Sequence, residues 1–196
     1  RMSRVGNLVV QEFVSADGFA ANDNNEFDMY SSVSDWSLFD RSNLSWISSA
    51  GGILLGAKTY EEFVRYWPSP DASEELLAGA INALPKHVFS RTRTEAAWGD
   101  FAPAIVESGD TAATVTRLKK QHQGDLIVWG SLSLVATLIE LGMVDSIRLV
   151  VLPIAIGAGQ SVFPRGERNL SLVRCTEFPG GVVELEYSIE PAVEDL

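Results

Sequence analysis

Two short runs with no polar residue, Ile53–Gly56 and Leu126–Trp129, restrict the possible fold more than any other part of the sequence. A strand without a polar face is covered on both sides, which is typical of a parallel sheet between layers of helices. Segments with helical periodicity lie between such runs. The sequence therefore predicts an α/β protein.

The pattern predicts eight strands and five helices. The strands are expected over residues 8–14, 53–56, 87–90, 104–107, 126–129, 146–154, 170–178 and 182–189, and the helices over 33–49, 58–65, 71–83, 111–121 and 132–141. Strands and helices alternate up to residue 141, and strands alone follow. We expect one three-layer domain over residues 1–196, with a mostly parallel sheet, an antiparallel C-terminal edge and helices on both faces.

Charge and cysteine content exclude several classes of function. The 26 Asp and Glu residues exceed the 15 Lys and Arg residues, which gives a formal net charge of −11 and argues against binding to nucleic acid or anionic membranes. The single cysteine, Cys175, cannot form a disulfide within one chain and is expected in the core. His87 and His122 are far apart in the sequence, so each is expected to be structural or exposed, and no metal site is predicted. With no transmembrane or leader segment in view, cytoplasm is the predicted location.

Polar and cationic residues follow three of the predicted strands. They are Gly56–Thr59, Ser90–Arg93 and Gly130–Ser131. Ligands of open α/β sheets bind beyond the carboxyl ends of the strands, and helix N-termini and guanidinium groups suit phosphate. Each junction alone could be an ordinary helix start or a surface turn. Together they predict one phosphate-rich ligand that spans several strand ends.

At these strand ends the chain resembles the dihydrofolate reductase superfamily, most closely the C-terminal reductase domain of the bifunctional riboflavin-biosynthesis deaminase/reductase. The residues that carry the resemblance are Ser15–Ala20, Ile53–Glu61, Lys86–Thr92, Asp125–Gly130, and Leu141–Leu149 leading to Pro153–Phe163. The resemblance implies an eight-stranded sheet and NADPH as hydride donor. It also implies a homodimer that reduces a small pteridine- or pyrimidine-like substrate of the riboflavin-pathway type.

The resemblance carries cofactor contacts onto particular positions. Gly56, Ala57, Lys58 and Thr59 would bind the pyrophosphate, and Ser90 and Arg91 the 2′-phosphate. The nicotinamide end would lie beside Ala20, Ala21, Gly130, Ser131 and Leu132. Arg93 is a further candidate cation.

The substrate side is less fully defined. By position, Asp40 matches the acidic residue on the first helix of dihydrofolate reductases, with Asp35 as the competing candidate, and Trp129 and Tyr60 are the expected apolar walls. The family usually has Gly-Gly where this chain has Gly130-Ser131, and the usual Leu-Pro-Trp before the first helix is missing. These departures leave open a non-catalytic NADP-binding or sensing protein, or a dimerisation domain without a ligand.

Overall fold

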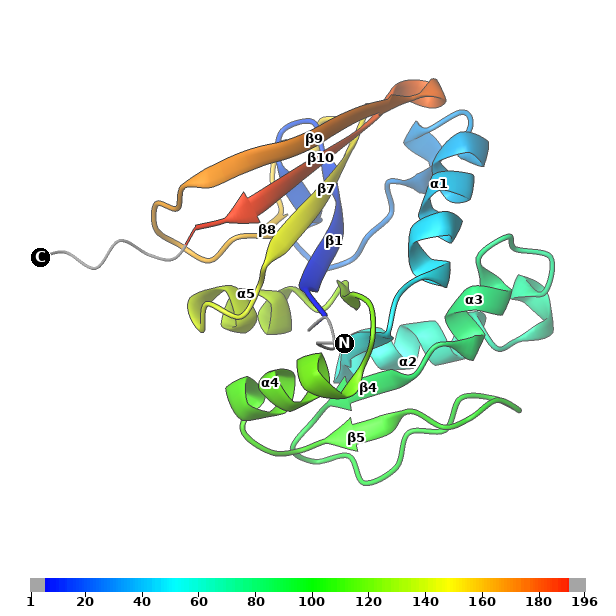
Figure 1. The fold of residues 1–196 in the computed structure, drawn as a ribbon. Coiled ribbons are helices and arrows are strands. Elements are labelled where there is room, and N and C mark those ends of the chain that lie inside the picture. The colour runs from blue at the N-terminus through cyan, green and yellow to red at the C-terminus, as the bar shows by residue number, and fades with distance from the viewer. Residues whose placement is uncertain (1–5, 191–196) are drawn as a thin grey trace, which may run out of the picture.

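The computed structural model describes residues 6–190, so the two ends of the predicted domain, 1–5 and 191–196, lie outside the described residues. One sheet of eight strands forms the centre, in the order β5-β4-β3-β6-β1-β7-β10-β9 (Figure 1). Pairs from β5 to β7 are parallel, and β10 is antiparallel to both β7 and β9, which confirms the predicted class of fold. The strands are β1 (Leu8–Ser15), β3 (Gly52–Gly56), β4 (Lys86–Phe89), β5 (Ile105–Glu107), β6 (Leu126–Trp129), β7 (Ser146–Leu152), β9 (Leu170–Phe178) and β10 (Val182–Ile189).

Helices cover both faces of the sheet. One core cluster joins the sheet to α4 (Thr111–Gln121) and α5 (Leu132–Glu140), and another joins it to α1 (Ser37–Ser48), α2 (Ala57–Tyr66) and α3 (Ala78–Ala83). Leu54 points into the first cluster, and its neighbours Ile53 and Leu55 point into the second. All three are fully buried, as expected of a strand without a polar face.

The predicted helix over 71–83 is wrong in its first half. Pro70–Ala72 forms a short 3₁₀ helix, and α3 begins only at Ala78. Pro70 opens the 3₁₀ turn, and the backbone N–H and hydroxyl of Ser73 both donate to the Pro70 carbonyl. These local bonds compete with an α-helical ladder, so Asp71 and Glu74 do not cap a helix there. The first helix likewise begins at Ser37 rather than at residue 33.

A two-stranded ribbon, β2 (Phe19–Ala21) with β8 (Gln160–Ser161), was not predicted. It ties the loop after β1 to the loop after β7, and the Asp17 carboxylate accepts hydrogen bonds from the N–H of Ile156 and of Gly157 at 3.2 and 2.7 Å. A Cβ at Gly159 would lie 2.1 Å from the Ala21 carbonyl oxygen, so only glycine permits this contact.

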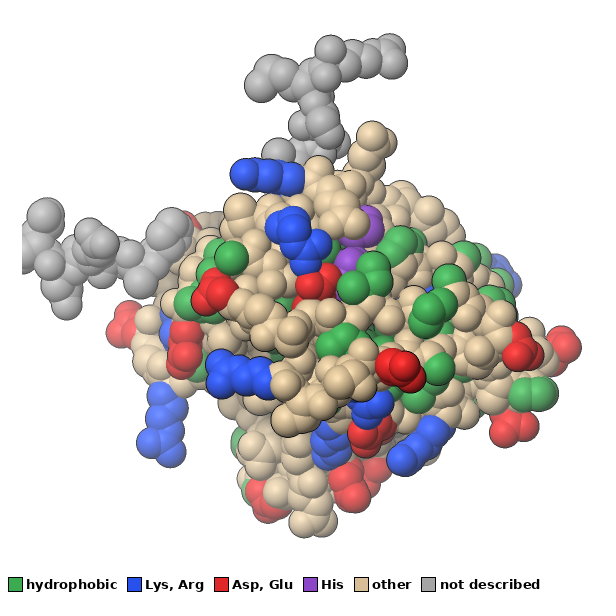
Figure 2. Space-filling model, turned by 90° about the horizontal axis from the view of Figure 1, so that it is seen from below, with side chains coloured by type: hydrophobic (Ala, Val, Ile, Leu, Met, Phe, Trp, Pro, Cys, Tyr) green, Lys and Arg blue, Asp and Glu red, His purple; other side chains and the backbone are tan. Residues whose placement is uncertain are grey.

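The two histidines are distant in sequence but adjacent in the structure. Their Nε2 atoms lie 3.0 Å apart, and His87 Nδ1 lies 2.8 Å from a Glu107 carboxylate oxygen. Figure 2 shows the purple histidine atoms close together, on a face where acidic, basic and hydrophobic side chains are mixed. His87 is fully buried, so the pair joins β4 and β5 to the end of α4 as a structural contact.

Cys175 is exposed, which corrects the prediction that it is a core residue. It lies on β9, the last strand of the sheet order, where most residues are exposed. Strand alternation alone does not reveal whether a strand lies at an edge.

None of the helices between residues 6 and 190 is long and apolar enough to cross a membrane.

Candidate functional site

A cavity of about 1100 Å³ opens where β1 extends past the end of β6. The paired residues of these strands end at Gln11 and Trp129, whereas β1 continues to Ser15 alongside β7. The chain leaves β6 at Gly130, which lines the cavity. The cavity therefore lies at the carboxyl end of a parallel strand, where ligands of α/β sheets bind.

Hydrogen bonds lock the ends of β3 and β6 together at this cavity. The Gly56 N–H donates to Ser131 Oγ at 2.7 Å, and the Ser131 N–H donates to Thr59 Oγ1 at 2.9 Å. Gly130 has a left-handed backbone (φ +54°), and a Cβ there would lie 3.0 Å from the Thr59 side chain. The peptide between Gly130 and Ser131 is trans, and Ser131 also adopts a positive φ. The N-termini of α2 and α5 meet here, and neither has a side-chain cap.

Most of the expected cofactor residues lie along this cavity. They are Ala20, Ala21, Lys58, Thr59, Gly130, Ser131 and Leu132. Gly56 and Ala57 are not among its lining residues; Gly56 takes part in the junction through its backbone, and Ala57 begins α2.

The expected 2′-phosphate residues lie elsewhere. Ser90 and Arg91 follow β4 and do not line the cavity. Ser90 Oγ accepts the N–H of Arg93 at 3.1 Å, and Arg91 is exposed. The Arg93 guanidinium pairs with Glu61 at 2.7 Å and stacks on Tyr60 at 4.7 Å. Lys58 is the only cation among the described residues that line the cavity, and its ammonium donates to the Asn25 carbonyl at 3.0 Å.

On the substrate side, the structure separates the paired candidates. Asp40 lines the cavity, whereas Asp35 is exposed outside it and accepts the N–H of Ser37. Trp129 lines the cavity, as expected. Tyr60 does not: it is 4% exposed, and its hydroxyl donates to the Ala97 carbonyl at 2.6 Å, so its place is in the core beneath α2.

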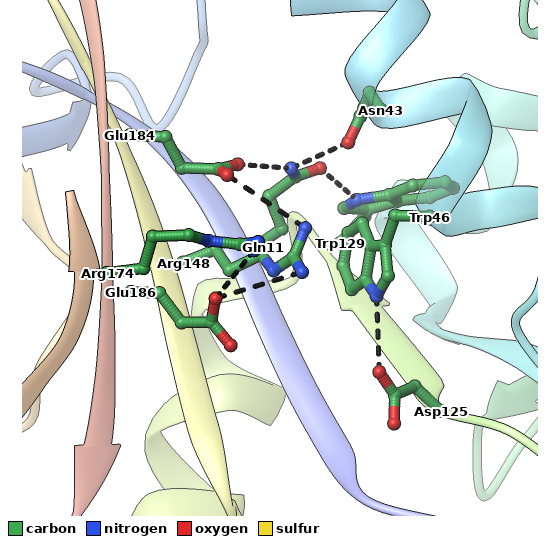
Figure 3. Close-up of polar contacts among 9 residues, drawn as sticks. All are labelled: Gln11, Asn43, Trp46, Asp125, Trp129, Arg148, Arg174, Glu184 and Glu186. Atoms are coloured by element: carbon green, nitrogen blue, oxygen red, sulfur yellow. Dashed lines mark hydrogen bonds and ion pairs between the residues drawn. The ribbon is translucent and has the colours of Figure 1, made fainter. Parts of the chain in front are cut away.

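Buried hydrogen bonds fix the floor of the cavity (Figure 3). The Gln11 amide donates to Asn43 Oδ1 at 2.9 Å and to Glu184 at 3.3 Å, and the Trp129 indole N–H donates to Gln11 Oε1 at 2.8 Å. Gln11 thus joins α1, which carries Asp40, and the strands β6 and β10 to β1. Sequence patterns do not predict this network, because its members are far apart in the chain.

Glu12 is a further lining residue that sequence analysis missed. It is only 6% exposed, and its Oε1 accepts no hydrogen bond within the described part of the chain. Burial holds the pKa of this carboxyl well above its ordinary value. The sequence contains a pattern that could have revealed this buried carboxyl group. Strand alternation puts Glu12 on the same face as Leu8, Val10 and Val14, which are core residues.

Sequence analysis also missed a group of five aromatic side chains that form one wall of the cavity, called the aromatic wall below. Neighbouring rings pack edge to face or tilted, with centroids 4.6 to 6.1 Å apart. The wall consists of Phe13, Phe27, Tyr30, Trp36 and Phe39, and all five line the cavity. They come from β1, the following loop and α1, and only the fold brings them together.

Carboxyl groups dominate the charge of the cavity. Burial, and then the nearby Glu75 carboxylate, raise the pKa of Asp40. Glu75 accepts a hydrogen bond from the Tyr66 hydroxyl at 2.6 Å, and this bond raises the pKa of Tyr66 to about 12. Among the described residues, no group of three or more His, Cys, Asp or Glu side chains is arranged to hold a metal ion.

The family model described as the RibD C-terminal domain matches residues 7–183. The chain belongs to this family. Uncharacterized protein YyaP of Bacillus subtilis (strain 168) is 30% identical over 187 residues, which cover 92% of this chain and 93% of that protein.

Several solved structures share the fold of this chain. A protein from Shewanella sp. PV-4, provisionally named a riboflavin biosynthesis protein, has a TM-score of 0.77 at 16% identity, over 94% of this chain and 99% of its own. RibD from Acinetobacter baumannii has a TM-score of 0.69 at 13% identity, over 96% of this chain and 59% of its own. These similarities, at such low identity, establish the fold, and the family is one of reductases.

Proposed function

We propose that this chain is an NADPH-dependent reductase that transfers a hydride to a small pteridine- or pyrimidine-like heterocycle. The junction of Gly56, Thr59, Gly130 and Ser131 is the observation that carries the proposal. Two uncapped helix N-termini meet there, and they approach closely because Gly130 has no Cβ, which would lie 3.0 Å from the Thr59 side chain. Such a junction suits the phosphates of a dinucleotide. Membership of a reductase family supports the same function.

In this proposal each part of the cavity has a separate task. NADPH supplies the hydride when it is bound. Lys58 and the N–H groups at the helix starts hold phosphate oxygens, and Ala20, Ala21 and Leu132 flank the nicotinamide end. Asp40 holds the substrate or moves a proton to it, directly or through water. The aromatic wall orients a flat substrate and excludes water.

Titration with NADPH and NADH side by side tests the proposal. Trp129 lines the cavity, so bound cofactor is expected to quench tryptophan fluorescence at micromolar NADPH, and NADH is expected to bind more weakly. Lys58→Ala should weaken NADPH binding about tenfold, the cost of one charge-assisted contact. Lys120→Ala, on the exposed side of α4, should leave it unchanged. Absence of quenching by NADPH would refute the proposal.

Two further measurements refine the assignment. Loss of the preference for NADPH in Arg91→Ala would support the 2′-phosphate role of Ser90 and Arg91, and indifference would remove them from the site. Binding of NADPH without turnover of pteridines, pyrimidine intermediates or quinones would favour the non-catalytic alternative. The homodimer and the cytoplasmic location stay predictions, and sedimentation analysis checks the first.

A further inference from the structure

The walls of the cavity are mostly acidic, whereas a site for a phosphorylated substrate would be expected to present positive charge. Five acidic residues line it, against the single cation Lys58 among the described lining residues. They are Glu12, Glu26, Asp40, Glu62 and Glu75. The proposed function assigns Lys58 to the cofactor phosphates, so no other lining cation among the described residues is left for a phosphate on the substrate.

Three of these carboxyl groups reach the cavity from separate elements. Asp40 comes from α1, Glu75 from the segment before α3, and Glu12 from β1. No salt bridge within the described residues involves any of them.

Glu12 gives an independent indication of a ligand. It is 6% exposed, it lines the cavity, and its Oε1 has no hydrogen-bond partner among residues 6–190. A buried carboxyl without a partner is costly and rare in native structures, and a bound molecule or ion is one of the few things that can supply the partner.

The aromatic wall faces the same region. Tyr30 contacts Phe27 and Trp36 with centroids 4.6 and 5.9 Å apart, and all three line the cavity with the carboxyl groups. The π-faces of such rings attract cations as well as flat apolar molecules. A flat cation would therefore meet two favourable kinds of surface, and a phosphate would meet repulsion from several carboxylates.

We infer that the substrate end of this cavity selects a flat, positively charged or protonated heterocycle that carries no phosphate. The inference rests on the proposed function and narrows its substrate class. Asp40 and Glu75 supply the negative field, Glu12 supplies a buried carboxyl group that can hydrogen-bond the ligand, and the rings of Phe27, Tyr30 and Trp36 supply the contact surface.

Three probes that share a fused two-ring core and differ in charge test the inference. They are N-methylquinolinium, methylnaphthalene and naphthyl phosphate. Each is titrated into the intact protein and followed by the fluorescence of the cavity tryptophans, with and without NADPH. N-methylquinolinium should bind at least tenfold more tightly than methylnaphthalene, and naphthyl phosphate more weakly than both. Added NaCl should weaken binding of the cation and leave that of methylnaphthalene unchanged.

Charge-neutralising variants locate the effect. Asp40→Asn and Glu75→Gln should each lower the preference for the cation about threefold to tenfold, and the double variant should abolish it. Glu140→Gln removes the same charge from the exposed end of α5, outside the cavity, and should leave the preference intact. Equal binding of naphthyl phosphate, or a preference that survives the double variant, would overturn the inference.

The two proposals fail in different ways. If NADPH does not bind while N-methylquinolinium keeps its preference, the reductase proposal fails and charge selection stands. If NADPH binds and the cation gains nothing over methylnaphthalene, charge selection alone fails. The salt dependence of the unmodified protein decides the case even if the double variant does not fold.

Discussion

At the scale of single residues, Glu12 shows how one side chain departs from its surroundings. Core residues Leu8, Val10 and Val14 share its face of β1, yet Glu12 places a carboxyl group beside the cavity. The raised pKa means that the folded protein keeps the Glu12 proton at pH values where the unfolded chain has lost it. The associated stability is complete below the ordinary glutamate pKa of 4.5 and is lost as pH rises through the folded value.

Glu12→Gln is therefore expected to stabilise the protein at high pH. A neutral amide does not have to hold a proton, so the free energy of unfolding at pH 8 should rise by about 1–2 kcal/mol relative to the unmodified protein. At pH 4.5 the difference should vanish. Urea unfolding at both pH values measures it, with Glu140→Gln as the control that shows no such dependence on pH. A difference between Glu12→Gln and the unmodified protein that is equal at both pH values would contradict the assignment.

Residue positions that depend on strand ends were predicted in part, and those that depend on tertiary contact were not. Thr59, Gly130 and Ser131 follow predicted strands and line the cavity, whereas Ser90 and Arg91 also follow a predicted strand and do not. Tyr60 directly follows Thr59 in the sequence, but its side chain lies on the face of α2 that packs into the core. The partners of Gln11 lie up to 173 residues away, a separation that no local pattern encodes.

At the scale of elements, the histidine contact joins β4, β5 and α4. Burial is the largest cause that lowers the pKa of both His87 and His122, and for His122 the nearby His87 adds to it. Both side chains thus stay neutral in the folded protein at pH values where the unfolded chain is protonated. The stability from this contact is present above the ordinary histidine pKa of 6.5 and is lost as pH falls below it.

His122→Asn should flatten this dependence on pH. In the unmodified protein the free energy of unfolding is expected to fall by up to about 1 kcal/mol between pH 7 and pH 5.5. The variant has one histidine fewer to protonate on unfolding, so its decline should be smaller. Denaturant titrations across that range make the comparison. An unchanged slope would mean that the contact does not control stability.

Element boundaries show the limit of local sequence signals. The Asp-x-x-Glu pattern of Asp71–Glu74 predicted a continuous helix over 71–83, but Pro70 and Ser73 form a 3₁₀ turn that interrupts it. Where no such competing bonds exist, prediction and structure agree: α4 spans the predicted residues 111–121, and Asp110 caps it by accepting the N–H of Ala113 at 2.8 Å. The predicted helix over 132–141 ends within one residue of α5, and Gly142 follows it with a left-handed backbone (φ +65°).

At the scale of the whole molecule, the two apolar runs were sufficient to predict the class of fold. The excess of acidic residues affects the stability of the folded protein. A net charge of −11 means that the compact state suffers self-repulsion, which salt screens. Raising NaCl from about 10 to 150 mM, which shortens the screening length from about 30 to 8 Å, should raise the melting temperature by about 2–5 °C. Calorimetry at constant pH measures the shift, and a fall in melting temperature would show that attractive ion pairs dominate instead.

The place of β1 in the sheet has a consequence for biosynthesis. β1 lies between β6 and β7, and its Gln11 contacts Trp129, 118 residues later in the chain. At about 5–20 residues per second, a ribosome needs about 6–24 s to make that stretch. For those seconds an apolar strand has been translated and its two neighbours have not. A nascent chain of this kind is a natural client for a chaperone that shields unpaired strands until synthesis has passed residue 152.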